Sequence, residues 1–129
     1  MATLAVIGLG LDVVEMPRAR DLYNRLGDRI LDRTLTASER AYVQSLGDPV
    51  PAFAARLAAK EAVYKALQVL PGARGVGWRE IGVRRLDDGR PEVELTGRAA
   101  ALLPPGVRIH ISLTHSRDVA AAVVILEEG

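Results

Sequence analysis

The stretch that decides the fold reads RLAAKEAVYKAL and runs from Arg56 to Leu67. It lies within a longer segment, about residues 52–70, that is rich in strong helix formers and has no internal Gly or Pro. Pro51 suits the first helical position, because its missing N–H is one that a helix could not use there. The sequence therefore predicts a long helix near the middle of the chain.

This helix should carry apolar side chains on one face and a pair of charges on another. The apolar stripe is formed by Phe53, Leu57, Tyr64 and Leu67. Glu61 and Lys65 lie one turn apart on a side otherwise lined by Ala54 and Ala58, whose small side chains leave room for a ligand. The same spacing fits a plain i,i+4 salt bridge worth about 0.2–0.5 kcal/mol, which the helix alone favours.

Composition narrows the class of protein. The 129 residues suit a single domain spanning residues 1–129, and the longest apolar runs have the length of strands, so we expect no membrane span. A net charge of +1 and only one Phe, one Trp and three Tyr argue against a nucleic-acid partner. Zero Cys excludes disulfides and thiolate metal sites. No charged region precedes the first apolar run, so we expect no signal peptide and a cytoplasmic protein.

Residues 3–11 predict a buried strand that ends in Gly8-Leu9-Gly10. Asp12 follows directly, on the pleat face of Val6 and the two glycines, which allow another backbone or a ligand to approach. A carboxylate here suits a metal ion, and it equally suits the cap of a following helix whose first turn holds Pro17. The glycines are not a dinucleotide fingerprint, because the third Gly is absent.

The next predicted helix, residues 18–26, is closed by Gly27 and carries a basic face. This face consists of Arg18, Leu22, Arg25 and Arg29. Because Asp21, Asp28 and Asp32 are interleaved with it, the residues alone favour a solvated mixed-charge surface over a docking face for an acidic partner.

The remaining segments indicate an α+β domain with a largely antiparallel sheet. A capping box from Thr36 to Glu39 predicts a helix through about residue 46, followed by the central helix and a loop at residues 71–77. Residues 81–83 and 93–95 should form a hairpin, and residues 97–103 a short helix. Two strands then follow, 107–115, which ends at His115, and 119–126, which we expect to be central and covered on both faces.

Three of these features suggest a joint chemistry. Asp12 and Glu61 could bind one Mg²⁺, which keeps several waters and accepts a substrate phosphate as a further ligand. Lys65 would face the same phosphate, and His115 with an arginine could hold a second one. These are the parts of a metal-dependent phosphoryl-group transferase, although spacing alone does not establish one.

Three segments resemble the signature segments of the bacterial holo-(acyl-carrier-protein) synthase family, the small 4′-phosphopantetheinyl transferases. They are GLGLDVVE from Gly8 to Glu15, RLAAKEA from Arg56 to Ala62 with Lys65-Ala66, and ISLTHS from Ile111 to Ser116. They occur in the family's order and at its length, over about residues 4–127. The resemblance implies the 4′-phosphopantetheinyl transferase fold and the transfer of phosphopantetheine from coenzyme A to a serine of apo-acyl carrier protein, releasing adenosine 3′,5′-bisphosphate.

The same resemblance implies roles for particular residues. Asp12 and Glu61 would bind Mg²⁺, or Mn²⁺, together with the coenzyme A pyrophosphate, and Lys65 would contact the phosphates. Arg56 and His115 would hold the 3′-phosphate end of the nucleotide. The serine proton would pass to Glu61, through a metal-bound water, or to Lys65. The family also implies a homotrimer with active sites at subunit interfaces, and fatty acid biosynthesis as the setting.

The family's partner changes the interpretation of the basic face. Acyl carrier proteins are acidic, so the face of Arg18, Leu22, Arg25 and Arg29 becomes an expected docking surface. The chain departs from the family after Leu67, where Gln68 to Gly77 replace a tight Gly-Thr-Gly turn. Leu57 stands where the family commonly has Phe, and Tyr64 stands where a smaller residue is frequent. Both differences suggest that side chains around the central helix pack differently.

Two other functions remain as alternatives. A transferase for carrier domains of peptide or polyketide synthases would be about twice this length by family resemblance. A non-catalytic module that binds coenzyme A or a nucleotide would not need Asp12, Glu61 and Lys65 together, and metal dependence would distinguish it.

Overall fold

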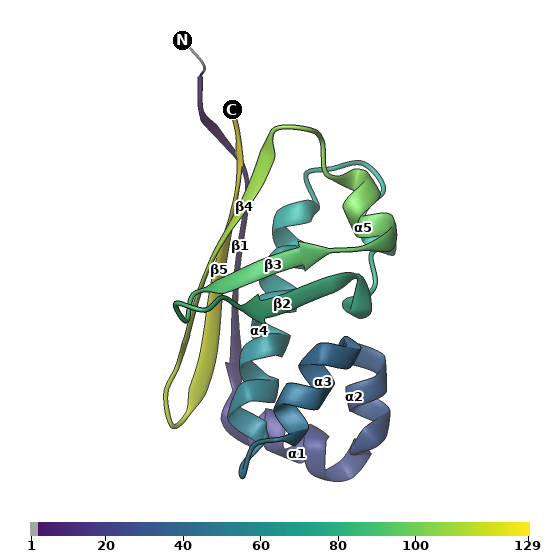
Figure 1. The fold of residues 1–129 in the computed structure, drawn as a ribbon, viewed down its shortest axis with the longest axis vertical. Coiled ribbons are helices and arrows are strands. Elements are labelled where there is room, and N and C mark those ends of the chain that lie inside the picture. The colour runs from purple at the N-terminus through teal and green to yellow at the C-terminus, as the bar shows by residue number, and fades with distance from the viewer. Residues whose placement is uncertain (1–2) are drawn as a thin grey trace.

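Two antiparallel sheets and a set of helices make up residues 3–129, which the computed structural model describes (Figure 1). In chain order the elements are β1 (Ala5–Glu15), α1 (Met16–Leu26), α2 (Asp28–Thr34), α3 (Ala37–Gln44), α4 (Val50–Leu67), the 3₁₀ turns η1 (Ala73–Gly75) and η2 (Trp78–Glu80), β2 (Ile81–Arg85), β3 (Pro91–Leu95), α5 (Gly97–Leu102), β4 (Val107–His115) and β5 (Val119–Glu128). The predicted α+β class and the antiparallel pairing are confirmed.

The larger sheet has the order β1-β5-β4, so β5 is the central strand, as predicted. Figure 1 shows α4 running along one face of this sheet, with the β2-β3 hairpin on the same side. Burial along β5 alternates, and Ala121, Val123 and Ile125 stay partly exposed. Within the single chain β5 is not covered on both faces as expected, because helices pack against one face only.

Helix α4 is buried around most of its circumference rather than along one stripe. Ala54 and Ala58 are fully buried, so the space beside them is filled by protein and is not open to a ligand. The small side chains instead let the helix lie close to its neighbours. Within residues 3–129 no helix combines the length and apolar character that a bilayer crossing requires.

Strand β1 extends beyond its predicted end, so Asp12 lies inside the strand. An irregularity in pairing between Val6 and Gly8 puts Val6 on the exposed face, while Gly8 and Gly10 are buried. Val6 therefore does not share the face of Asp12, contrary to the sequence prediction, because a bulge reverses the alternation of side chains. The N-cap of α1 is Glu15, which rules out Asp12 as that cap.

The helical region before α4 contains one more helix than the sequence predicted. Helix α2, from Asp28 to Thr34, begins directly after Gly27 and was missed because a seven-residue mixed-charge segment gives a weak pattern. Helix α1 with Gly27 at its C-cap, and α3 with its Thr36–Glu39 capping box, are confirmed. The hairpin and α5 also form where expected.

Candidate active site

Asp12 is brought to α4 by two glycines of β1. A Cβ atom on Gly10 would lie 1.8 Å from the carbonyl oxygen of Ala62, and one on Gly8 would lie 2.6 Å from that of Ala66. Only a strand without side chains at these positions can pack so closely on the backbone of α4. The glycines therefore accommodate a neighbouring backbone, and the carboxylate two residues after Gly10 arrives beside the charged side of the helix.

Asp12, Glu61 and Lys65 line one cavity of about 370 Å³. The Lys65 Nζ atom lies 3.0 Å from Asp12 Oδ1 and donates a second hydrogen bond of 3.0 Å to the carbonyl oxygen of Leu11. Lys65 thus pairs across to β1, and this contact takes the place of the intrahelical salt bridge with Glu61 that the spacing also allowed. The structure brings together the three residues that the sequence selected.

Glu61 is held in a charge environment that favours its neutral form. Partial burial raises the pKa of the Glu61 carboxyl above its usual value, and the negative charge of Asp12 raises it further. Lys65 and Arg18 act in the opposite direction, but they do not reverse the shift. Two carboxylates in one partly buried cavity repel each other, and a bound cation would remove that repulsion.

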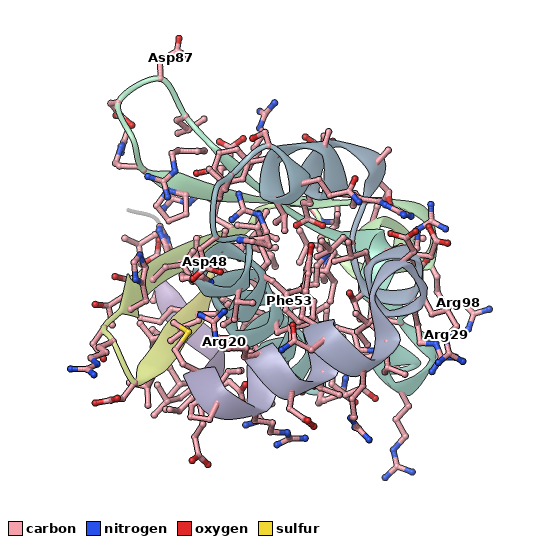
Figure 2. All side chains as sticks on the ribbon, turned by 90° about the horizontal axis from the view of Figure 1, so that it is seen from below. Arg20, Arg29, Asp48, Phe53, Asp87 and Arg98 are labelled. Carbon is pink, nitrogen blue, oxygen red and sulfur yellow. The ribbon has the colours of Figure 1, made fainter. Side chains whose placement is uncertain are left out.

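Arg18 and Leu22 of α1 line the same cavity as the carboxylates. Arg25, one turn further along, forms an exposed pair with Asp21 at 3.0 Å. Arg29 is exposed in α2, and Figure 2 shows it at the periphery, away from the core residue Phe53. The basic face is therefore continuous with the cavity at Arg18 and Leu22, and its other members lie further out.

Arg56 and His115 line a second cavity, of about 330 Å³, together with Thr114 and Arg85. Arg56 is buried, and its guanidinium carbon lies 4.6 Å from the ring centroid of Tyr42, a cation–π contact. Its Nε atom is buried without a hydrogen-bond partner among the described residues. Because Arg85 adds a second guanidinium group to the lining beside Arg56, this cavity is suited to an anionic ligand. No residue of this second cavity lines the first one.

A third cavity, of about 240 Å³, lies beneath the loop that follows α4. The Tyr64 hydroxyl donates to the carbonyl oxygen of Arg74 at 3.1 Å, and Gln68 Nε2 donates to that of Ala73 at 3.3 Å. Tyr64 thus fastens the loop, a role beyond the repacking that the sequence suggested. The loop replaces a tight glycine turn with one held in place by side chains.

Trp78 was missed by the sequence analysis, and it lines both the first and the third cavities. Among residues 3–129, Glu61 is the one other residue that lines both of them. The sequence did contain a signal for this position, because Trp78 is the single tryptophan and directly follows the loop at residues 71–77. Such a large side chain needs a surface to cover.

Comparisons with known proteins show which family this chain resembles. The model of the 4′-phosphopantetheinyl transferase superfamily matches residues 8–124. The holo-[acyl-carrier-protein] synthase of Koribacter versatilis is 43% identical over 126 residues, which cover 95% of this chain and 99% of that protein.

Solved structures extend the similarity to three dimensions. A holo-(acyl-carrier-protein) synthase from Bacillus anthracis, in complex with CoA (3′,5′-ADP), aligns with a TM-score of 0.79 at 30% identity and covers 96% of this chain and 98% of that one. An acyl carrier protein synthase of Mycobacterium tuberculosis aligns with a TM-score of 0.73 at 39% identity, over 97% and 100% of the two chains.

Proposed function

The chain belongs to the 4′-phosphopantetheinyl transferase superfamily, among its holo-(acyl-carrier-protein) synthases, and on that premise we propose its reaction and the residues that perform it. The enzyme transfers the 4′-phosphopantetheine group of coenzyme A to a serine of apo-acyl carrier protein and releases adenosine 3′,5′-bisphosphate. One observation supports this most directly. Asp12, Glu61 and Lys65 share a cavity with Arg18 and Leu22 of the basic face, so phosphate chemistry and carrier docking would meet there.

Asp12 and Glu61 are the proposed ligands of Mg²⁺, with Mn²⁺ as an alternative. Among residues 3–129 no group of three or more His, Cys, Asp or Glu side chains could hold a metal ion. A pair of carboxylates fits Mg²⁺, because this ion is commonly held by one or two carboxylates plus waters and phosphate oxygens. When bound, the ion would neutralise negative charge on the pyrophosphate oxygens.

Lys65 would exchange its contact with Asp12 for the phosphate that receives the attack. The serine oxygen forms a bond to the β-phosphorus of coenzyme A, and the bond from that phosphorus to the leaving phosphate oxygen breaks. The leaving group keeps the electron pair as adenosine 3′,5′-bisphosphate. The serine proton would pass to Glu61 or to Lys65.

The cavity of Arg56 and His115 would hold the 3′-phosphate of the nucleotide. The basic lining, which includes Arg56, Arg84 and Arg85, supports an anionic occupant. Since this cavity shares no residue with that of Asp12 and Glu61, one chain would use its own carboxylates beside the arginine and histidine of a neighbouring copy. Together with the family resemblance, which implies three copies, this separation leads us to propose a homotrimer with composite sites.

The outer face of the sheet supports such an assembly. Leu9, Leu11 and Val13 of β1 are 63%, 61% and 56% exposed, and they lie beside Ile125, Val123 and Ala121 of β5. Apolar side chains in a contiguous row on a sheet face indicate a protein contact. The proposed setting is fatty acid biosynthesis in the cytoplasm, with an acidic carrier docked on Arg18, Leu22, Arg25 and Arg29.

The decisive experiment measures the intact mass of an apo-acyl carrier protein after incubation with the enzyme, coenzyme A and Mg²⁺. A gain of one phosphopantetheine, lost with a chelator and with Asp12→Ala, would support the proposal. Asp48→Ala is the matched control, because Asp48 pairs with Arg20 on the surface at 2.9 Å (Figure 2). Tight coenzyme A binding without any mass gain, also on carrier domains of peptide or polyketide synthases, would favour a binding module.

A further inference from the structure

An ion pair is buried in the core directly beside the proposed site. Lys60 Nζ lies 2.7 Å from Glu39 Oε1, and the two side chains are 0% and 2% exposed. Lys60 precedes Glu61 in α4, and Glu39 lies in the first turn of α3. Lys60 lines the third cavity beside Glu61 and Trp78, but neither member of the pair lines the cavity of Asp12, so the chemistry proposed there does not account for the pair.

The pair connects four elements through hydrogen bonds. Glu39 accepts from the backbone N–H of Thr36 through Oε1, and from that of Val83 through Oε2, both at 2.8 Å. Lys60 Nζ donates to the carbonyl oxygen of Trp78 at 3.1 Å and also to that of Ile81. The helices α3 and α4 and the junction of η2 with β2 are thus fixed to one another by side chains.

A buried ion pair is a poor means of gaining stability alone. Moving both charges out of water is costly, and apolar residues of similar volume often serve the core as well or better. What the pair adds is geometry, since its hydrogen bonds have defined directions and lengths. It therefore restricts how far α4 can rotate, and how far residues 78–83 can slide along it.

The two residues that line both the first and the third cavities lie at the ends of this network. Glu61 follows Lys60 in the helix, so the rotation that keeps Lys60 in the core also aims Glu61 outward. Trp78 is held by its carbonyl oxygen, while its side chain lines both cavities. The buried pair thus connects the backbones that carry Glu61 and Trp78.

We propose that Glu39 and Lys60 are positioning residues that fix Trp78 relative to Glu61, and thereby set how coenzyme A is held for transfer. The role of coenzyme A in this inference rests on the proposed function. The pair touches no reacting atom, and it acts through the helix rotation and the Trp78 carbonyl. Loss of the pair should disturb ligand binding even in a protein whose stability is intact.

The test compares Lys60→Met, Glu39→Gln and the double variant. Each single change leaves a buried group without its partner and should lower the thermal midpoint, while the double change removes both charges and should recover part of the loss. In the double variant we expect coenzyme A to bind about 10- to 100-fold more weakly by calorimetry, with a lower kcat. A merely structural pair would recover affinity and kcat together with stability, and that result would overturn the proposal.

Trp78 supplies a readout that needs no substrate. It is the single tryptophan of the chain, so acrylamide quenching of its fluorescence reports on this position alone. Quenching should increase in the double variant without coenzyme A, and unchanged quenching would contradict the inference. If the parent protein transferred nothing to a carrier, the proposed function would fail while this measurement still decided the positioning role.

Two further variants control for failure of the double variant to fold and for the general effect of removing an ion pair. Glu39→Asp keeps both charges and shortens the reach by one methylene, so it should fold even if the double variant does not. Parent-like quenching and coenzyme A affinity in Glu39→Asp would also count against the proposal. Arg20→Met removes an exposed pair with Asp48, outside the three cavities, and should leave quenching, affinity and kcat unchanged.

Discussion

The proposed role of Glu61 as a metal ligand places its carboxylate where the negative charge lowers the stability of the folded protein. Its folded pKa is raised above its ordinary value of 4.5, so below that value the carboxyl is neutral in both the folded and unfolded states and costs nothing. As the pH rises through the ordinary value, the unfolded state loses its proton first. The folded state is then penalised, and the penalty is complete above the raised pKa.

Glu61→Gln should therefore be more stable than the parent at neutral pH, while the two proteins converge in acid. Urea midpoints in chelator at about pH 7.5 and about pH 4 would check this. Added Mg²⁺ should raise the midpoint of the parent but not of Glu61→Gln, because the variant lacks a metal ligand. A less stable variant at neutral pH would mean that Glu61 supports the fold.

Single residues also show what a sequence can and cannot predict about a site. Asp12, Glu61 and Lys65 stood out as charges at a glycine strand or above small side chains, but the local sequence left ordinary explanations open, and the family resemblance supplied their expected roles. Glu39, Lys60 and Trp78 did not stand out, since a helix-capping glutamate and a lysine next to Glu61 have ordinary explanations nearby. Their contacts join residues far apart in the chain, and spacing along the sequence does not reveal them.

At the level of elements, the contact between β1 and α4 depends on Gly10. Gly10→Ala would place a Cβ atom against the Ala62 carbonyl, so strand and helix must move apart. We expect a loss of about 1–3 kcal/mol or more in the free energy of unfolding, measured in urea. Gly47→Ala is the control, because its added Cβ would meet nothing within 4 Å, and an equal loss there would remove the packing explanation.

The loop after α4 yields a prediction about binding. Tyr64→Phe removes the hydrogen bond to the Arg74 carbonyl, worth about 0.5–1.5 kcal/mol, from the loop above the third cavity. Because the third cavity shares Glu61 and Trp78 with the proposed site, the Michaelis constant for coenzyme A should rise several-fold, while that for the carrier protein stays near the parent value. Equal rises in both constants would indicate a general disturbance rather than a loop effect.

Helices and strands that are marked by a capping or turn motif in their own sequence were predicted well. Those that depend on packing against distant parts of the chain were not. The capping box of α3 and the Asp-Gly hairpin carry their own chemistry, so they formed where expected. Helix α2 and the full length of β1 depend on what packs against them. The apolar pattern of α4 suggested a single stripe, but protein on nearly every side buries it.

For the whole molecule, the exposed face of the sheet should control assembly. Leu11→Asp would place a charge among Leu9, Val13 and Val123, and burying that charge between copies would be costly. Light scattering after gel filtration should show a trimer for the parent and mainly monomer for the variant. Because Leu11 is exposed in the single chain, the monomer should remain folded by circular dichroism, and an unchanged trimer would place the interface elsewhere.

The double role of Glu39 has an evolutionary consequence. Because one carboxylate both caps α3 and neutralises Lys60, neither position can drift alone without passing through a weakened intermediate. The two sites should behave as an epistatic unit, changing together between lineages or not at all. A chimaera that takes helices α1 to α3, and with them position 39, from a relative would therefore also need that relative's residue at position 60.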